Sequence, residues 1–251
     1  HWPETMVTYL EEDKLLFSCD AFGSYGALQN GLFDDELDMD FYIEEARRYF
    51  SNIVAKYTKN VLDAIKKLEK IDIKIIAPSH GPIYRSNPNR IVDLYKKWSQ
   101  SDADKNRVLV IYGSMYGRGE AIVDRIVDRL RKENLIVVEH NASLSHPSYI
   151  LSDLIESYTT ILVYPSYDAG IFPYIDNILR IFQLKQVGIG RYVAIVNTYA
   201  WASTAKQATE MLLKAGFKII EPVVETKAIP DEEENKKIEQ LLNNIISISK
   251  Q

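Results

Sequence analysis

The sequence predicts an α/β protein of two domains, in which residues 104–251 form a doubly wound parallel sheet of five strands and residues 1–103 form a separate domain. Three observations carry this prediction. The chain of 251 residues exceeds the usual size of one domain. Beyond residue 104, short runs rich in Val and Ile alternate strictly with segments that repeat apolar residues at helical spacing. Those short runs are apolar throughout, as expected of strands that helices cover on both faces.

The N-terminal domain is predicted to mix helices with a strand. Residues 44–70 repeat apolar residues three and four apart, which predicts one long helix or two in series. Residues 73–77 form a β-branched strand, and Pro78-Ser79-His80-Gly81-Pro82 excludes regular structure after it. His80 is therefore predicted to lie on a loop at a strand end. Residues 90–99 predict another helix, and the polar run 101–106 is the predicted domain boundary.

The C-terminal domain is predicted as an unbroken alternation of strands and helices. Its strands are expected over residues 108–112, 135–139, 160–164, 192–197 and 217–223. Its helices are expected over residues 120–133, 149–157, 174–186, 202–215 and 231–249.

Composition narrows the classes of function. A net charge of -5 leaves no basic surplus for binding nucleic acid. No run of about 18 apolar residues occurs, so no membrane span is predicted. One cysteine, Cys19, and no leader at the start of the chain predict a soluble protein of the cytoplasm, a reducing compartment. Because the chain opens on His1 rather than methionine, we expect a segment to precede it.

Three loops are candidates for a ligand site, because ligands of doubly wound sheets bind at the carboxyl ends of the strands. The first loop follows strand 108–112 and combines a hydroxyl, glycines and backbone N–H groups at a helix start, which predicts a phosphate cradle. It lacks the pattern of a Walker loop or a Rossmann fingerprint. The alternative is a turn that merely uses glycine. Its residues are Ser114, Met115, Tyr116, Gly117, Arg118 and Gly119.

The other two loops place aromatic residues at the same sheet edge. Aromatic faces stack on a flat ring system while loop N–H groups bond its heteroatoms, so these loops predict a site for such a ring. The alternative for any single Tyr or Trp is ordinary packing. The second loop comprises Pro165, Ser166, Tyr167, Asp168, Ala169 and Gly170. The third comprises Asn197, Thr198, Tyr199, Ala200, Trp201 and Ala202.

These loops resemble those of the flavodiiron proteins, also called A-type flavoproteins. The resemblance lies in the strings Tyr-Gly-Ser-Met-Tyr-Gly and Pro-Ser-Tyr-Asp-Ala-Gly-Ile-Phe-Pro and in the loop ending in Tyr-Ala-Trp. It implies a flavodoxin-like domain that binds FMN noncovalently, with the phosphate at the first loop and the isoalloxazine at the other two. The family's phosphate loop commonly continues with small hydroxyl residues, whereas this chain has Arg118 and Gly119. Arg118 would either replace the lost hydroxyl with a charge-assisted bond or point to solvent.

The resemblance extends to residues 1–103, which it implies are the C-terminal part of a metallo-β-lactamase-like αβ/βα domain. His1, Asp20 and His80 each lie in a short motif, and eighteen residues, 2 to 19, separate the first two, as in the family. The resemblance implies that Asp20 bridges two irons while His1 and His80 each bind one. The family's upstream His-x-Glu-x-Asp motif does not occur in these 251 residues. The chain would therefore supply about half of a diiron site, and a separate N-terminal fragment, a nicked chain or a two-chain enzyme would each account for the rest. Alone, two imidazoles and a carboxylate suit a single zinc or iron with open positions.

Each of these residues also has a plainer interpretation. Asp20 alone would cap a turn, and His80 alone would close a loop. Cys19 is predicted to be a small core residue, since no basic partner adjoins it. Tyr49 suits a substrate pocket and core packing equally. The remaining histidines are predicted to be ordinary surface or loop residues; they are His140 and His146.

The function that the resemblance implies is that of a flavodiiron oxidoreductase. In such an enzyme, FMN passes electrons to a non-haem diiron centre that reduces dioxygen to water or nitric oxide to nitrous oxide. The resemblance further implies a head-to-tail homodimer, or a multiple of one, and an electron donor such as a rubredoxin, a flavin reductase or a reduced deazaflavin. The alternative is a flavodoxin-type electron-transfer module on a degenerate, metal-free scaffold. A hydrolase is disfavoured because hydrolysis needs no flavin.

Overall fold

The protein is an α/β protein of two compact units, His1–Asp102 and Ala103–Gln251. The structure is a computed structural model that describes residues 5–227 and 229–250, with Arg118 described by its backbone alone. Within these ranges, no helix has the length and apolar content that a bilayer crossing requires.

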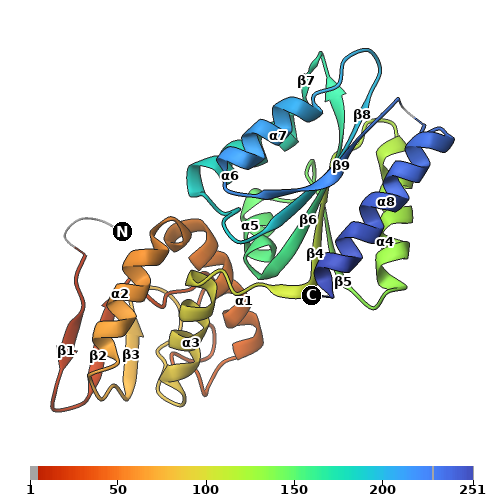
Figure 1. Cartoon of the computed structure of the whole chain (residues 1–251). Coiled ribbons are helices and arrows are strands. Elements are labelled where there is room, and N and C mark those ends of the chain that lie inside the picture. Colours follow the sequence, from red (N-terminus) through yellow and green to blue (C-terminus); the bar gives the residue numbers. More distant parts are fainter. Residues whose placement is uncertain (1–4, 228, 251) are drawn as a thin grey trace. The chain divides into compact units, whose positions relative to one another are not determined.

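The first unit is a three-stranded sheet with three α-helices (Figure 1). The strand order is β1-β2-β3, with β1 antiparallel and β3 parallel to the central strand β2. Leu16 of β2 and Ile76 of β3 are buried on one face of this sheet, where Ile76 lines a cavity together with residues of α2 and α3. The bounds are β1 Thr8–Leu10, β2 Leu15–Cys19, β3 Ile75–Pro78, α1 Met39–Tyr49, α2 Thr58–Leu68 and α3 Pro88–Ser99.

The helical segment predicted over residues 44–70 is two α-helices in series, and it starts earlier than predicted, at Met39. Between α1 and α2 lie a π-helical turn, η1 (Phe50–Val54), and a 3-10 turn, η2 (Ala55–Tyr57). Ser51 Oγ and Asn52 Nδ2 both donate to the carbonyl oxygen of Arg48, at 2.9 and 2.7 Å. Side chains that compete for a backbone acceptor in this way disturb the regular helical ladder.

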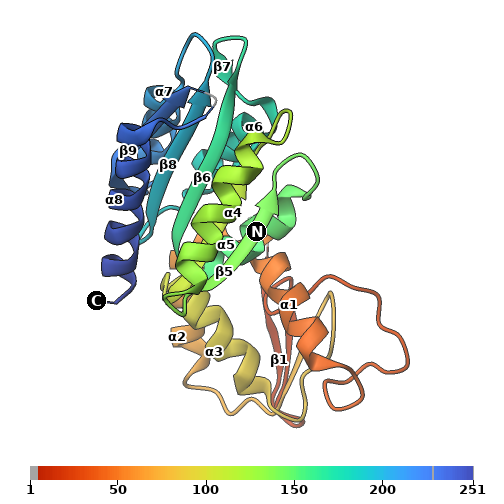
Figure 2. The same ribbon diagram turned by 90° about the vertical axis from the view of Figure 1, so that its right-hand side faces the viewer.

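The second unit contains the predicted doubly wound sheet of five parallel strands, in the order β5-β4-β6-β8-β9. A short strand that was not predicted, β7, pairs antiparallel with the end of β6. Both views show β7 at the end of the sheet where β6 and β8 finish (Figures 1 and 2). The bounds are β4 Asp104–Tyr112, β5 Ile136–Asn141, β6 Ser157–Tyr167, β7 Gly170–Ile171, β8 Tyr192–Tyr199 and β9 Lys218–Lys227.

Helices cover both faces of this sheet, each over its own apolar cluster. Helices α4 (Arg118–Arg131) and α8 (Glu232–Ser249) lie together on one face (Figure 1). The other face carries α5 (Pro147–Glu156), α6 (Pro173–Lys185) and α7 (Ala205–Lys214).

Local sequence explains where several of these helices start. Both α5 and α6 begin with proline, whose missing N–H costs nothing there, and Asp231 and Glu234 form a capping box at α8.

Several strands run further than predicted. β4 begins at Asp104, inside the polar run predicted as the domain boundary. β6 continues to Tyr167 and β8 to Tyr199. The two strands pair with each other as far as Pro165 and Thr198, and their last residues pair with β7 and β9. Two of the predicted loops therefore start on strands. Helix α7 begins at Ala205, three residues later than predicted.

Two single-residue predictions are wrong. Cys19 is only partly buried and ends β2 with a φ of 54°, so it is not a core residue. His140 lies on β5 and is largely buried rather than at the surface or on a loop. Its Nε2 lies 2.8 Å from Asp153 Oδ2 and its Nδ1 lies 3.0 Å from Ser145 Oγ. His146 is exposed and caps α5, accepting a bond at Nδ1 from the N–H of Ser148 at 3.2 Å.

Candidate functional site

The turn between β4 and α4 has the properties of a phosphate cradle. Ser114 Oγ is buried and has no hydrogen-bond partner among the residues that the structure describes. Gly117, the N-cap of α4, has a φ of 76°, a left-handed conformation that favours glycine. A Cβ on Gly119 would lie 3.0 Å from the carbonyl oxygen of Gly113, so the turn also needs a small residue there. A buried hydroxyl beside the N–H groups of a helix start suits an anion.

A cavity of about 380 Å³ opens at this turn. It lies where the strand order reverses, since β4 is flanked by β5 on one side and β6 on the other. Open α/β sheets bind ligands at such a switch point. All three predicted loops contribute to its lining, and the volume lies in the range of cofactor sites. The lining residues are Ser114, Met115, Tyr116, Gly119, Pro165, Ser166, Thr198, Tyr199 and Ala200.

Large aromatic rings on the same loops face solvent. Tyr116 is 96% exposed, Trp201 is 74% exposed and Tyr167 is 48% exposed. Tyr116 lines the cavity, whereas the other two do not. Exposed rings at the ends of strands are available to stack on a flat ligand or on a partner protein.

Other predicted residues shape the loops without lining the cavity. Asp168 and Ala169, with φ of 47° and 56°, form the turn between β6 and β7, and Gly170 starts β7. Arg118 is the first residue of α4, and Ala202 lies in the partly exposed segment before α7. Asn197 is fully buried, and its side chain bonds inside the protein to both strand ends. Sequence reasoning missed its partners Ser203 and Thr204, which carry no motif.

In the first unit, Asp20 and His80 lie side by side. Asp20 directly follows β2 and His80 lies two residues after β3, and because these strands are parallel neighbours both side chains start from the same sheet edge. The N–H of Ser79 donates to the carbonyl oxygen of Cys19 at 2.7 Å, and the N–H of Ser24 donates to that of His80 at 3.2 Å. These bonds hold the two loops together and bring His80 Nε2 to 3.4 Å from Asp20 Oδ1.

Within the described ranges, no third Cys, His, Asp or Glu joins this pair to complete a metal site. His1, the other predicted ligand, lies outside the described residues. The Tyr49 ring is buried and lies 5.8 Å from the His80 ring, between their centroids. Burial, with a smaller contribution from the charge of Asp20, raises the pKa of the Tyr49 phenol. The Tyr49 side chain therefore places an uncharged ring beside His80.

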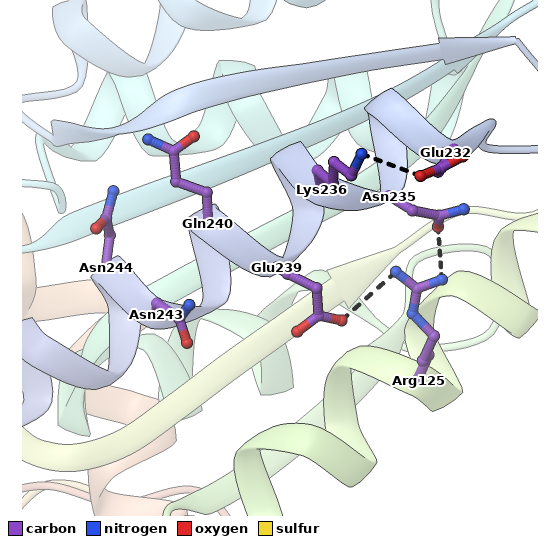
Figure 3. A pocket seen from close by; sticks show the side chains of 8 residues that line it. All are labelled: Arg125, Glu232, Asn235, Lys236, Glu239, Gln240, Asn243 and Asn244. Carbon is purple, nitrogen blue, oxygen red and sulfur yellow. Dashed lines mark hydrogen bonds and ion pairs between the residues drawn. The ribbon is translucent and has the colours of Figure 1, made fainter.

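A larger hollow, of about 620 Å³, lies elsewhere in the second unit, between α4 and α8. Figure 3 shows that its charged residues pair with one another. Arg125 Nη2 lies 3.7 Å from Glu239 Oε1, and Lys236 Nζ lies 3.0 Å from Glu232 Oε1. Because these charges are solvated and paired, the groove has the character of an ordinary polar helix surface.

Comparisons with known proteins agree with this geometry. Residues 110–240 match the family described as flavodoxin. The rubredoxin oxygen:oxidoreductase of Desulfovibrio gigas superposes with a TM-score of 0.93 at 25% identity, over 100% of this chain and 63% of that one. A variant of the flavo di-iron protein of Thermotoga maritima superposes with a TM-score of 0.87 at 29% identity, over 99% and 62%. The nitric oxide reductase of Moorella thermoacetica is 28% identical over 86% of this chain and 54% of its own length. The chain thus spans between about half and two thirds of these relatives.

Proposed function

Because the chain belongs to the flavodoxin family, we propose that its second unit binds FMN and works in electron transfer within an oxidoreductase of the flavodiiron type. The observation that carries the proposal is the cavity built from three strand-end loops, with the unpartnered hydroxyl of Ser114 at its phosphate cradle. Bound FMN would supply the ability to accept and release one or two electrons.

The residues present fit FMN. Ser114 Oγ and the N–H groups at the start of α4 would hold the phosphate. The walls at residues 165–166 and 198–200 would hold the ring and keep water from it. The cradle offers one phosphate site and no fingerprint for a second nucleotide, which favours FMN over FAD.

We propose that Asp20 and His80, with His1, are ligands of a non-haem diiron centre in the complete enzyme, which would reduce dioxygen or nitric oxide. The names of the relatives from Desulfovibrio gigas, Thermotoga maritima and Moorella thermoacetica support these activities. The residues that the structure describes do not make a metal site by themselves. The second candidate is a flavodoxin-type electron-transfer module on a metal-free scaffold, and metal analysis of the purified protein separates the two.

Further polypeptide would be needed to complete the centre. The sheet face opposite Leu16 carries exposed apolar side chains, with Phe17 48% and Leu10 39% exposed. Exposed apolar clusters mark contact surfaces, and the relatives are longer than this chain. We propose that a further segment or chain covers this face and supplies the remaining ligands. We also propose a rubredoxin-type donor, which the name of the Desulfovibrio gigas relative supports. A head-to-tail homodimer is part of the same proposal and rests on the family resemblance alone.

The experiment that tests the flavin proposal is a titration of the apoprotein with FMN, FAD and riboflavin, followed by flavin fluorescence. We expect FMN to bind tightest, and Ser114→Ala to weaken FMN binding by about tenfold, the cost of one charge-assisted bond. Riboflavin, which has no phosphate, should bind Ser114→Ala and the unmodified chain equally. A chain that takes up none of the three flavins would refute the proposal. Metal analysis of the same preparation separates the diiron candidate from the metal-free one.

A further inference from the structure

One buried amide joins two neighbouring strand ends, those of β6 and β8, which both contribute to the lining of the cavity. Asn197, near the end of β8, has no exposed surface. Its Nδ2 donates to the carbonyl oxygen of Tyr164 on β6 at 3.1 Å. Its Oδ1 accepts from Ser203 Oγ and from the N–H of Thr204, each at 2.9 Å. A buried amide with both its donor and its acceptor engaged holds its partners in a fixed arrangement.

Ser166 connects this network to the cavity. Its Oγ lies 3.3 Å from both amide atoms of Asn197 and 3.1 Å from Thr204 Oγ1. Ser166 on β6 and Thr198 on β8, the neighbour of Asn197, both line the cavity. The amide therefore ties the end of β6 to the end of β8 and to the segment before α7.

The phosphate cradle is built from different elements. Residues 114–119 lie between β4 and α4, whereas the bonds of Asn197 run to β6, to its own strand β8 and to the start of α7. We propose that Asn197 is a positioning residue that holds Ser166, the end of β6 and the segment before α7 in the arrangement that binds the flavin ring, and thereby controls ring binding independently of the phosphate. The inference rests on the proposed function and adds to it a residue that holds the ring-binding loops in place.

The physical reason is that a flat ring needs the residues around it to be held in precise positions. A site must be held to within about 0.5 Å of its productive geometry, and packed walls achieve this only through their supporting bonds. Removing the amide would leave the Tyr164 carbonyl and the Thr204 N–H without this partner, and the walls would relax. FMN and riboflavin share the ring, so both should lose affinity by the same factor.

The test measures the dissociation constants of FMN and riboflavin for the full chain and for Asn197→Ala. We expect both constants to rise by about tenfold, with their ratio unchanged. Ser203→Ala removes one bond to the amide from a residue outside the cavity lining, and should show the same pattern with a smaller rise. It keeps the test decisive if Asn197→Ala does not fold.

Ser157→Ala is the matched control. Ser157 is equally buried and starts the same strand, β6, at the opposite end of the sheet, where its Oγ donates to the carbonyl oxygen of Asp153 at 2.8 Å. This variant loses a buried hydrogen bond and should bind both flavins normally. Unchanged affinities in Asn197→Ala, or a loss of FMN affinity larger than that of riboflavin, would overturn the inference while the proposed function stands. An unmodified chain that binds neither flavin would overturn both.

Discussion

At the scale of single residues, Gly81 shows how the Asp20 and His80 pair depends on backbone space. Gly81 has a φ of 82°, and a Cβ there would lie 2.1 Å from Ser24 Oγ and 3.0 Å from the Ser24 backbone nitrogen. Ser24 is buried, so it has little room to move away. The loop that carries His80 can therefore approach the loop that carries Asp20 only because residue 81 lacks a side chain.

We predict that Gly81→Ala lowers the free energy of unfolding by about 1–3 kcal/mol, the cost of a strained left-handed residue, with the overlap added. Urea unfolding followed by circular dichroism measures it. Ser24→Gly in the same chain removes the overlap with the Ser24 side chain but neither the approach to its backbone nitrogen nor the strain, so the double variant should recover part of the loss. Full stability in Gly81→Ala would show that the two loops separate more easily than their bonds indicate.

Asp34 gives the molecule an acid-sensitive contact. Its carboxylate is buried and accepts bonds from the Arg85 N–H at 2.9 Å, from Ser86 N–H and Oγ at 3.0 and 2.6 Å, and from the Asn87 N–H at 3.3 Å. Burial alone raises the pKa of Asp34, but the bonds from Ser86, Arg85 and Asn87 together outweigh it and lower the pKa below the ordinary value. The carboxylate therefore fixes residues 31–36 to the start of α3 while it stays ionised.

The pH dependence of the protein's stability follows from the lowered pKa of Asp34. A carboxyl whose pKa is lower in the folded state contributes stability above its unfolded pKa, about 3.9, and loses it as pH falls through the folded pKa. We predict that Asp34→Asn destabilises the protein by about 1–3 kcal/mol at pH 7, and that its difference from the unmodified chain shrinks below about pH 4. Urea unfolding from pH 7 to pH 3 tests this, with the exposed Asp13→Asn as control. A difference that stays constant with pH would contradict it.

At the scale of elements, Arg191 shows how one helix ends and one strand begins. Its guanidinium is buried and donates to the carbonyl oxygens of Leu154 and Ile155, at the end of α5, at 3.1 and 2.8 Å. It also donates to the carbonyl oxygens of Val187 and Ile189 before β8, at 3.1 and 3.2 Å. Burial lowers the pKa of Arg191 to about 10, so it stays charged at neutral pH and complements the carbonyl end of the helix dipole.

We predict that Arg191→Leu costs about 3 kcal/mol or more, because several buried carbonyls lose their donor at once. Arg191→Lys should cost nearly as much, since one ammonium group cannot reproduce the planar fork that serves both segments. Thermal and urea unfolding measure both variants. If lysine restored full stability, the charge rather than the fork would be the feature that matters.

The elements of the second unit could be predicted because its helices and strands each carry a strong local signal. Apolar β-branched runs alternate with helical periodicity, and this fixed the five parallel strands and their helices. Strand β1 was missed because three residues are too few to show a period, and β2 was missed as well. β6 and β8 were predicted too short because their ends are extended by pairing with each other, with β7 and with β9, which is a long-range effect.

The loops that form the candidate site could also be predicted from the sequence. A doubly wound sheet dictates which strand ends meet, so the three loops around the cavity could be predicted before their geometry was known. The roles of single residues could not. Asn197 bonds to Tyr164, 33 positions away, and no local pattern reveals such a contact. His140 was assigned to the surface for the same reason, since its partner Asp153 belongs to another element.

At the scale of the whole molecule, the two units differ in what they hold. Both apolar clusters that sandwich the large sheet consist of residues between Val108 and Ile246, all in the second unit. Every residue that lines the cavity proposed to bind FMN also belongs to that unit. The first unit has its own buried residues, including Leu16, Phe50, Tyr95 and Trp98, and holds Asp20 and His80. The two candidate chemistries are thus assigned to separately folded parts of one chain.

This division leads to the last prediction. Residues 103–251, produced alone, should fold cooperatively and bind FMN within about threefold of the full chain, because no cavity residue and no member of either sheet cluster is removed. A threefold change corresponds to about 0.6 kcal/mol, which is less than the value of one hydrogen bond. Calorimetric unfolding and an FMN titration of both proteins make the comparison, and Ser114→Ala in the short protein should lose FMN affinity by the same factor as in the long one. If the isolated unit folds but binds FMN more than tenfold more weakly, then residues 1–102 contribute directly to the flavin site, and the assignment of each chemistry to its own unit is wrong.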